Sequence, residues 1–494
     1  TVLNHYILEH SWRWLSDPGY VGSLWTAPFF HPEPWTLAFS ENLFAVAPVY
    51  WLLRCGLDPV TAYQTWMMVL AALDFAAMAV VLRWFGVRHL LCVLGAYLFA
   101  FSLPAINQIV HQQLLARMFA PFAVYYGWAF LQTPSNRALG RLVLWWVLQV
   151  WAGIYLSWFL TLALAVLALA CLGLVPGSWG RLKEYAGANR RTVGKLALAA
   201  VLGTAPVLVP YMVGNFGIGW SYEMAEAMLP RPESWLTSPP EGVWHEALKP
   251  IAADPAHERW LFAGFGLLLT VALAGVFLAR PGGEGGTPAY RLTACFLMTA
   301  LVLVLITMQW ADGWSAWKPI FYCVPGARAI RAVARIFLIV YLFALIGGLV
   351  GVQALAESRL RRPALRSVLY AALACFAIGE QLGTEPQSIP VSAVYPRAEE
   401  LAARVRASGA GAAYFVPTPG RSLYEEEVAA MWAGLRANVP VVNGYSGRYP
   451  LTYPNTFEQR PVEAVREWLT SHGWRGRVAI LWPDGREETV TIGP

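Results

Sequence analysis

Long apolar runs separated by short polar connections make up most of the chain before about residue 380. The runs fall at about residues 60–82, 90–106, 114–131, 142–174, 196–213, 260–278, 292–310, 336–352 and 368–378. Most of them approach the roughly 20 residues that a helix needs to cross the hydrocarbon core of a bilayer. Only helices and closed barrels cross bilayers, and these runs lack the alternation of barrel strands. They predict an all-α polytopic membrane protein.

The apolar block at residues 142–174 is too long for one crossing and too short for two full ones. It is interrupted around Gly153 and flanked by basic residues, with Arg141 before it and a run of lysines and arginines from Arg181 to Lys195 after it. Because basic connections stay on the cytoplasmic side, the block predicts a hairpin of two short helices that turns near Gly153. With this hairpin, we expect roughly 9–10 membrane helices.

The basic connections also predict which polar segments lie on the outer face. The links at residues 280–291 and 359–366 are short and basic, which is typical of cytoplasmic loops. Alternation then places outside the long loops at residues 1–58, 214–259 and 311–335, the short loop at 104–112 and everything after about residue 383. Within the first loop, the stretch NLFAVAPVYWLL is too short to span and predicts an interfacial helix.

The composition changes after about residue 387, where charged amphipathic stretches replace the apolar runs. RAEELAARVRAS, SLYEEEVAAMWAGLRA and VEAVREWLTSHG predict helices, whereas GAAYFVP, RVAILWP and EETVTI predict strands. We therefore expect two domains, a transmembrane domain at residues 1–383 and a small extracytoplasmic α/β domain at residues 384–494. The latter contains no phosphate-binding glycine loop, no GxSxG and no metal-ligand spacing.

Composition supports a membrane protein and argues against a nucleic-acid partner. Hydrophobic residues make up 57% of the chain and charged residues only 13%, whereas soluble domains are about 25% charged. The net charge is +6, but the arginines cluster in connections between apolar runs, where they act as a topology signal. The six cysteines show no CxxC spacing and mostly lie in apolar runs, so they predict neither a metal site nor a disulfide framework.

Two glutamates in the first loop are candidate catalytic groups. Glu33 and Glu41 lie with His31 in FFHPEPWTLAFSEN. Either carboxylate could act as a general base or hold a metal near the membrane face, or could be solvated or cap a helix. The aromatic residues of this stretch could stack on sugar rings or form the interfacial belt of a membrane protein.

Further polar candidates lie in the other outer segments. His111 and Gln113 occur in INQIVHQQLL, and Tyr222 occurs in the long loop. His111 is a candidate catalyst or a hydrogen-bonded interfacial residue. Asp74 lies alone in the middle of an apolar run, where a charge is costly, so we expect it to have a structural partner.

Three arginines in VPGARAIRAVARI precede an apolar run on the expected outer face. The spacing of Arg328, Arg331 and Arg335 predicts one cationic face at the start of a membrane helix. These side chains could extend to the interface and bind lipid headgroups. Guanidinium groups also suit a clamp for a phosphate or pyrophosphate, and both alternatives remain open.

Several stretches spread along nearly the whole chain share a loose pattern with a known family. They are ILEHSWRWL and LWTAPFFHPEPWTLAFSENLFAVAPVYWLLRCGLDPVTAYQ in the first loop, FAFSLPAINQIVHQQLL, the helix pair around Gly153, VPGARAIRAVARIF and AAMWAGLRANVPVVNGYSGRYP. In these features the chain resembles bacterial integral membrane glycosyltransferases of the GT-C type. No single motif among them is diagnostic.

The resemblance implies an enzyme of the bacterial cytoplasmic membrane. Such an enzyme moves a sugar from a polyprenyl-phosphate donor to a glycan or lipid acceptor on the outer face, within membrane lipid. The resemblance implies no fixed cofactor and allows a divalent cation such as Mg or Mn. Arg331 and Arg335 match the place where these proteins carry cations that can hold a lipid phosphate.

The chain departs from this family at its start. An acid soon after the first membrane helix usually serves there as catalytic base or metal ligand, but no acid precedes Glu9 in TVLNHYILEH. We therefore expect the first helix and the primary carboxylate to lie upstream of Thr1 or to be absent. Glu33 and Glu41 carry over only as candidates for a second acid.

A different class of protein is also compatible with the pattern. A carrier or flippase for lipid-linked saccharides, or a structural membrane protein with an outer binding domain, would share the same apolar runs. A transporter is expected to place ionisable groups near the bilayer midplane. Here such charge is nearly limited to Asp74, which favours chemistry at the membrane surface.

Overall fold

The computed structural model describes residues 2–252, 254, 256–280, 286–383, 395–454 and 460–493. The chain forms two compact units. The helical unit consists of Met67–Thr204 and Gly219–Gln387, and the sheet unit consists of Thr1–Trp66, Ala205–Ile218 and Ser388–Pro494. The sheet of the second unit is thus grouped with the start of the chain.

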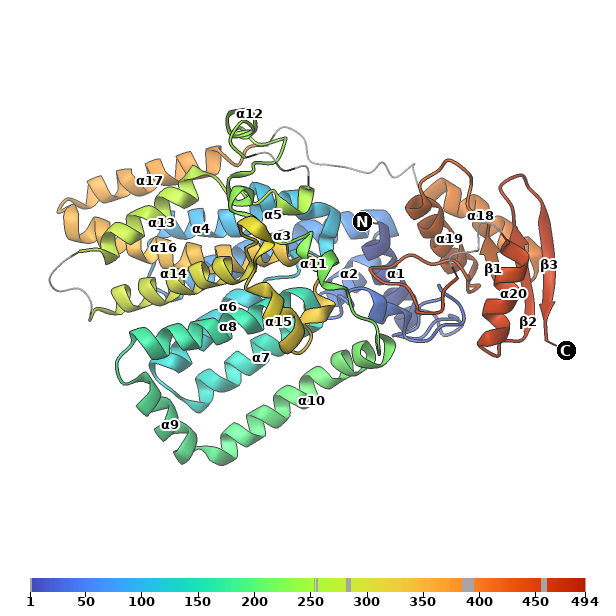
Figure 1. Ribbon diagram of the computed structural model, residues 1–494, viewed down its shortest axis with the longest axis horizontal. Coiled ribbons are helices and arrows are strands. Elements are labelled where there is room, and N and C mark those ends of the chain that lie inside the picture. The colour runs from blue at the N-terminus through green and yellow to red at the C-terminus, as the bar shows by residue number, and fades with distance from the viewer. Residues whose placement is uncertain are drawn as a thin grey trace. The chain divides into compact units, whose positions relative to one another are not determined.

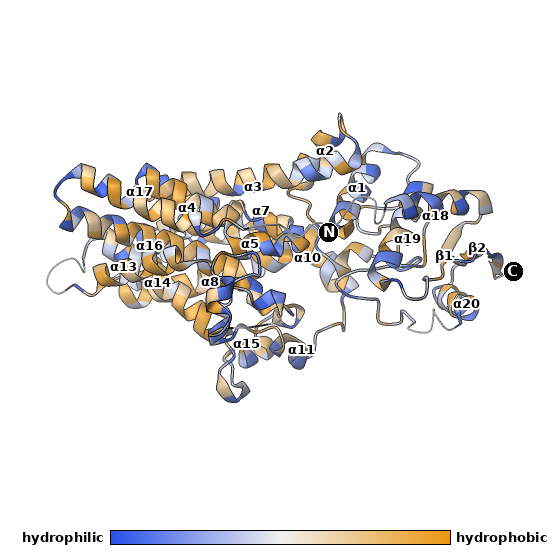
Figure 2. Cartoon of the chain, turned by 90° about the horizontal axis from the view of Figure 1, so that it is seen from above, coloured by the Kyte–Doolittle hydropathy of each residue, from blue (hydrophilic) through white to orange (hydrophobic). Residues whose placement is uncertain are grey.

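The helical unit is a bundle of apolar helices that lie side by side (Figures 1 and 2). Its long helices are α3 (Pro59–Trp84), α4 (His89–Phe101), α6 (Phe119–Gln132), α7 (Asn136–Ala152), α8 (Ile154–Leu174), α9 (Ser178–Ala188), α10 (Arg190–Gly214), α13 (Phe265–Leu278), α14 (Pro288–Thr307), α16 (Phe337–Arg359) and α17 (Pro363–Gly379). The first residues of α3 and the last residues of α10 belong to the sheet unit. Among the described residues, 7 segments are long and apolar enough to cross a membrane. The predicted multi-pass helical fold is confirmed.

Short helices and 3-10 turns connect the long helices of this unit. They are α5 (Leu103–Asn107), η2 (Gln108–Leu115), α11 (Tyr222–Glu226), η3 (Pro232–Leu236), α12 (His245–Leu248), η4 (His257–Arg259), η5 (Ala311–Gly313), α15 (Trp317–Cys323), η6 (Ala327–Ala329) and η7 (Val333–Ile336).

Helix α16 forms the centre of the bundle, where it packs between α13 and α14. A Cβ atom added at Gly351 would lie 2.6 Å from the Cβ of Ala274 on α13, and one added at Gly347 would lie 2.9 Å from the Cβ of Phe296 on α14. Small residues let membrane helices approach each other closely. These glycines therefore set the close packing of the three helices.

The predicted turn between two antiparallel helices at Gly153 is confirmed, but the prediction that both helices are short is wrong for α8. Helices α7 and α8 meet at Gly153, and the indole Nε1 of Trp146 on α7 donates to the hydroxyl of Thr161 on α8 at 2.8 Å. Because these two residues lie at similar distances on either side of Gly153, the helices run antiparallel. Helix α8 has 21 residues, so it is long enough to span and is not the short helix that we expected.

The apolar run at residues 260–278 becomes a helix only from Phe265 onward, because Gly264 breaks it. Gly264 has φ +99°, and a Cβ atom there would lie 2.3 Å from Oε1 of Glu380. That carboxylate accepts hydrogen bonds from the backbone N–H groups of Phe265 (2.8 Å) and Gly266 (2.6 Å) and from the indole of Trp244 (3.0 Å). Glu380 thus satisfies free N–H groups at the start of α13.

Asp74 was predicted to have a structural partner, and the structure places Arg117 beside it. Nε of Arg117 lies 3.5 Å from Oδ2 of Asp74, and both side chains are almost fully buried. Arg117 also donates to the carbonyl groups of Leu114, Phe99 and Ala100. The pair is therefore held by a network of backbone groups inside the bundle, as a structural ion pair would be.

The sheet unit contains a three-stranded sheet in the order β1 (Ala412–Phe415), β2 (Gly476–Leu481) and β3 (Glu487–Ile492). Strands β1 and β2 are parallel, with Ala412 opposite Val478, and β2 and β3 are antiparallel. The helices of this unit are α1 (Val2–Ser16), η1 (Thr36–Phe39), α2 (Ala47–Arg54), α18 (Tyr395–Ser408), α19 (Leu423–Ala437) and α20 (Pro461–Ser471). All six elements predicted after residue 387 are confirmed.

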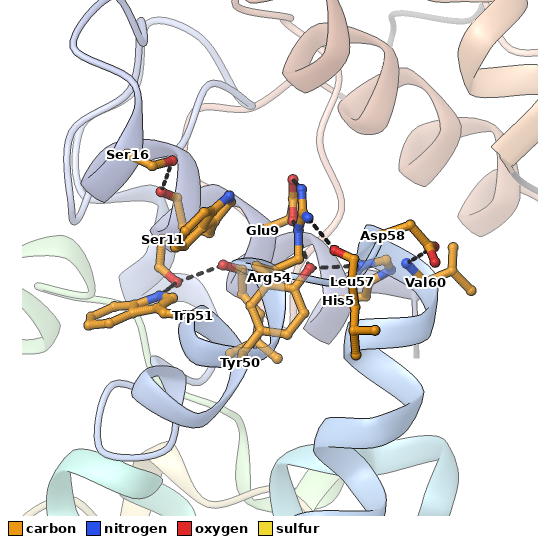
Figure 3. A network of polar contacts seen from close by, with 12 residues as sticks. His5, Glu9, Ser11, Ser16, Tyr50, Trp51, Arg54, Leu57, Asp58 and Val60 are labelled. Carbon is orange, nitrogen blue, oxygen red and sulfur yellow. Dashed lines mark hydrogen bonds and ion pairs between the residues drawn. The ribbon is translucent and has the colours of Figure 1, made fainter.

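Helix α1 was not predicted. Its sequence contains several polar residues that are buried in the structure, and such a sequence is more typical of an exposed loop. A network of polar contacts joins it to α2 (Figure 3). The hydroxyl of Tyr50 donates to Oε2 of Glu9 at 2.7 Å, and Nε of Arg54 donates to the same oxygen at 2.8 Å. Nε2 of His5 lies 3.2 Å from the Tyr50 hydroxyl. Since that hydroxyl donates to Glu9, it accepts from His5, and burial lowers the pKa of His5 to about 3.

The aromatic residues of FFHPEPWTLAFSEN form part of the core of the sheet unit. Phe29, Phe30 and Phe39 are at most 3% exposed. The ring of Phe30 packs against Tyr449 and Tyr453, at centroid distances of 5.4 and 4.8 Å. These three rings are thus neither a sugar platform nor an interfacial belt, and both predictions are wrong for them.

Candidate active site

Four polar side chains from three separate parts of the chain meet in the helical unit. We call His111, His257, Glu258 and Arg335 the Glu258 cluster. His111 lies in η2, His257 and Glu258 lie in η4, and Arg335 lies in η7 just before α16. Helical backbone angles are interrupted at His111 (φ −118°, ψ 64°).

Glu258 is the centre of this cluster. Its carboxylate accepts two hydrogen bonds from the guanidinium of Arg335, from Nε to Oε2 at 3.0 Å and from Nη2 to Oε1 at 2.5 Å. Nε2 of His111 lies 3.2 Å from Oε1. The bidentate geometry is the strong form of an arginine–carboxylate pair, and the two side chains are only 10% and 14% exposed.

Glu258 is ionised at neutral pH. Burial alone would raise the pKa of this carboxyl group, but the charge of Arg335 and the hydrogen bonds from His111 and Arg335 hold it well below its usual range. Such a carboxylate accepts hydrogen bonds and donates none. Nε2 of a neutral His111 therefore carries the proton, and Nδ1 keeps a free lone pair.

His257 is held beside the other imidazole. Its Nε2 donates to the carbonyl of Asn107 at 3.1 Å, because a carbonyl only accepts. The rings of His111 and His257 are 6.0 Å apart, and the ring of Trp260 meets His257 edge-on at 5.6 Å. Nδ1 of a neutral His257 is thus the second imidazole lone pair of the cluster.

The cluster lies where helices begin. Tyr155 is at the start of α8, where its hydroxyl accepts a hydrogen bond from the backbone N–H of Ala332 at 2.5 Å, and the Arg335 guanidinium lies 5.5 Å from its ring. Arg331 lies 4.6 Å above the ring of Trp220. The segment between Arg331 and Arg335 thus contacts the start of α8 through Ala332 and Tyr155.

Three residues of the cluster are also placed to hold a metal ion. One ligand atom from each of His111, His257 and Glu258 lies within 4.8 Å of the others, and two imidazoles with a carboxylate suit a transition metal such as Zn²⁺. A divalent cation would share Glu258 with Arg335. The arginine and a cation would therefore compete for one carboxylate.

The structure brings together some of the residues that the sequence singled out. His111 and Arg335 meet through Glu258, and Arg331 is four residues from Arg335. The prediction that the arginines share one face of a helix is wrong, because Arg328 lies in η6, Arg331 follows it in irregular backbone, and α16 begins only at Phe337.

Two other predicted residues, Tyr222 and Gln113, also lie in the helical unit. Tyr222 is buried in α11, where its ring meets Phe321 at 5.5 Å and the Lys318 ammonium lies 5.4 Å away. Gln113 lies in η2, two residues after His111.

His31, Glu33 and Glu41 belong to the sheet unit. Oε2 of Glu33 lies 3.1 Å from Nε2 of His472, just after α20. The backbone carbonyl of His31 accepts a hydrogen bond from the indole of Trp468 at 2.8 Å, and burial next to His472 lowers the pKa of His31 to about 4. Glu41 follows Ser40, whose carbonyl accepts from the hydroxyl of Tyr211 at 2.6 Å.

Sequence reasoning missed His257 and Glu258. They occur in the tripeptide His-Glu-Arg just before an apolar run, and this position was the available signal. The third residue, Arg259, pairs with Asp254 at 2.6 and 2.9 Å, so only two of the three side chains join the cluster.

No protein-family model matches the chain, and no curated protein matches it. Among solved structures, the chain is similar to the crystal structure of ArnT from Cupriavidus metallidurans in the apo state. The TM-score is 0.37 and the sequence identity is 13%, over 99% of this chain and 94% of that chain. A similarity of this size supports no inference about activity.

Proposed function

We propose that the chain is a membrane glycosyltransferase that moves a sugar from a polyprenyl-phosphate donor to a hydroxyl group of a glycan or lipid acceptor. The Glu258 cluster carries this proposal. It combines an oriented imidazole with neighbouring cations at the ends of apolar helices, and transfer from a lipid phosphate needs a base and an anion site in this setting.

His111 is the proposed general base. Glu258 fixes the imidazole through Nε2, which leaves Nδ1 to take the proton from the acceptor hydroxyl as it attacks the anomeric carbon. The arrangement follows the general rule that a carboxylate sets the tautomer and orientation of a catalytic histidine. Arg335 keeps Glu258 ionised, so Glu258 and Arg335 act as positioning residues.

Arg331 is the proposed partner of the leaving phosphate. Its guanidinium pairs with no carboxylate among the described residues, and it stacks on Trp220 beside the start of α8. A cation that is not neutralised by a protein carboxylate can bind the phosphate whose charge grows as the sugar leaves. Arg328, whose carbonyl accepts from the backbone N–H of Trp220 at 3.1 Å, is close enough in the chain to assist.

The cellular setting is part of the same proposal. We place the protein in the bacterial cytoplasmic membrane with the Glu258 cluster and residues 384–494 on the outer face, where polyprenyl-linked sugars are used. Support comes from the basic links at residues 280–291 and 359–366, which favour the cytoplasmic side. A carrier of lipid-linked saccharides is the competing class.

The test is a transfer assay with the purified full chain in lipid nanodiscs and a panel of polyprenyl-phosphate sugars. We expect His111→Asn to lower kcat by about 10²–10⁴-fold, the usual contribution of a general base, and Arg331→Ala to lower kcat/KM. Glu223→Gln and Arg191→Ala, which change exposed residues, are the matched controls and should leave turnover unchanged.

Two outcomes would contradict the proposal. The first is that no donor in the panel is consumed, especially if vesicles containing the chain move lipid-linked sugars between leaflets. The second is that His111→Asn and Arg331→Ala both retain full turnover. Glu33→Gln and Glu41→Gln belong in the same assay, because the prediction that they supply an acid stays open.

A further inference from the structure

We infer that a cavity next to the Glu258 cluster binds a sugar that carries a carboxylate or phosphate group. The cavity has a volume of about 260 Å³ and lies entirely in the helical unit, between α12 and η4. Ligand pockets for drug-sized molecules measure about 300–1,000 Å³. This cavity is therefore of the size for one monosaccharide unit.

An indole forms one wall of the cavity. Trp260 lines it, and its Nε1 donates to the carbonyl of Asp254 at 2.8 Å, so the ring is held in place. Its ring also meets the ring of His257 at a near-right angle. A fixed, partly exposed aromatic face is a platform for the apolar face of a sugar ring, and this one connects the cavity directly to the cluster.

The polar groups of the cavity are few, and most of them are already used. Asp254 accepts from Arg259 and from the backbone N–H of Ala256 at 2.9 Å, and the hydroxyl of Ser238 donates to a backbone carbonyl. Nδ1 of His245 donates to the carbonyl of Ser238 at 3.0 Å, since a carbonyl only accepts. Nε2 of a neutral His245, which lies 4.0 Å from the exposed carboxylate of Glu246, is then an acceptor for a sugar hydroxyl.

Lys249 decides the charge of the ligand. Lys249 lines the cavity, and its side chain makes no ion pair or hydrogen bond with any of the residues that the structure describes, whereas Asp254, which also lines the cavity, is neutralised by Arg259. The cavity therefore presents one uncompensated positive charge beside an aromatic wall and one acceptor. A ring with hydroxyl groups and one anionic substituent is complementary to all three.

This inference rests on the proposed function, because it assigns the cavity to the acidic sugar of a substrate. The position of Trp260 between the cavity and His257 would place a hydroxyl of that sugar near the imidazoles. The binding itself needs no turnover, so it can be tested separately.

The experiment measures binding to the purified full chain in nanodiscs by saturation-transfer NMR and calorimetry. The probes are methyl glucuronide, glucose 6-phosphate and the neutral methyl glucoside. We expect one or both anionic probes to bind with a Kd on the order of 1 mM and at least about tenfold more tightly than the neutral one. A preference for one of them identifies the anionic group.

Matched variants separate the contributions of Lys249 and Trp260 to probe binding. Lys249→Gln should remove the preference for an anionic probe, and Trp260→Ala should weaken all probes by about tenfold. Lys183→Gln and Trp179→Ala change exposed residues of α9 and should bind like the wild type. Lys249→Arg keeps the charge and should retain the preference, which guards against a folding defect in Lys249→Gln.

Equal binding of the three probes, or an anionic preference that survives Lys249→Gln, would overturn the inference. If anionic probes bind through Lys249 but no lipid-linked sugar is transferred, the cavity is correct and the proposed function fails. If transfer depends on His111 but is indifferent to Lys249 and to acidic acceptors, the function holds and the cavity assignment fails.

Discussion

The ion pair at the centre of the cluster leads to a prediction about stability that does not depend on the substrate. Replacing Glu258 by Gln leaves the guanidinium of Arg335 buried without its counter-charge, and replacing Arg335 by Gln does the same to Glu258. Each single change should destabilise the helical unit. The double change removes both charges and should cost less than the two single changes together.

The magnitude follows from the geometry. With N–O contacts of 3.0 and 2.5 Å, the two charge centres are about 4 Å apart, which corresponds to about 4 kcal/mol at an effective dielectric constant of about 20. Removing one partner of a buried pair typically costs about 3–5 kcal/mol. We therefore expect a coupling energy of about 2–4 kcal/mol between the two positions.

Thermal unfolding in detergent measures this coupling through cysteine labelling. Cys92, Cys171 and Cys295 are buried in the helical unit, so a thiol-reactive fluorophore gains access to them when the unit unfolds. On the scale of domains of 150–250 residues, the single changes should lower Tm by roughly 6–20 °C. Glu223→Gln and Arg191→Gln, alone and combined, give the baseline for exposed charges.

Additivity would refute the reasoning. If the double variant loses as much Tm as the two single variants combined, the two side chains do not stabilise each other, and the cluster is not a pre-organised site. A double variant that recovers most of the loss would establish the contact between residues 77 positions apart in the chain.

Three further predictions follow from the same contacts. Because the pKa of Glu258 is lowered on folding, its ionised form contributes stability above the unfolded pKa of about 4.5; the Tm difference between wild type and Glu258→Gln should therefore be constant above about pH 5 and shrink as the pH falls below that value. Arg335→Gln should tighten Zn²⁺ binding, measured by calorimetry, because it frees Glu258 from a competing cation; equal affinity in wild type and variant would contradict the shared carboxylate. Gly264→Ala should lower Tm by an amount equivalent to about 2–4 kcal/mol, because its φ of +99° and the 2.3 Å approach to Glu380 both oppose a Cβ atom; Gly275→Ala, at an open position on α13, is the control.

The membrane fold could be predicted from sequence because its signals are local. An apolar run of about 20 residues predicts a membrane-spanning helix without information from the rest of the chain. The break at Gly153 can likewise be seen in the run that contains it. The start of α13 could not be found in this way. Residues 260–264 continue the apolar run, and the helix begins only at Phe265, where Gly264 breaks the run and the carboxylate of Glu380, more than 100 positions later, accepts from the first N–H groups.

Composition does not predict secondary structure where polar residues are buried. Helix α1 carries His5, Glu9 and His10, all of them buried, so its sequence is typical of an exposed loop. His5 and Glu9 find partners on α2 and α18, including Tyr50 and Tyr395, and His10 finds one in Tyr20 of the following loop. A buried polar helix is stable only when its polar groups are hydrogen-bonded. The sequence of α1 alone does not show which residues elsewhere in the chain supply those hydrogen bonds.

The candidate residues chosen from sequence, which stay predictions, differ from the Glu258 cluster for the same physical reason. Glu33 and Glu41 were favoured because they are acids in an aromatic loop, a property of the segment alone. Glu258 was overlooked because nothing near it in sequence distinguishes it from an exposed glutamate. Its chemistry arises when η2, η4 and η7 bring an imidazole and a guanidinium to it.

The same reasoning makes the arginines informative. Arg331 and Arg335 are four positions apart, yet Glu258 neutralises only Arg335, while Arg331 stacks on Trp220. A patch that binds lipid headgroups would need both guanidinium charges available. In the proposed site for one phosphate, Arg331 binds the phosphate, and Arg335 holds Glu258, which in turn positions His111. The difference between the two arginines therefore favours a site for one phosphate over a general attraction to lipid, and it requires that Arg331→Ala impair donor use more than membrane insertion.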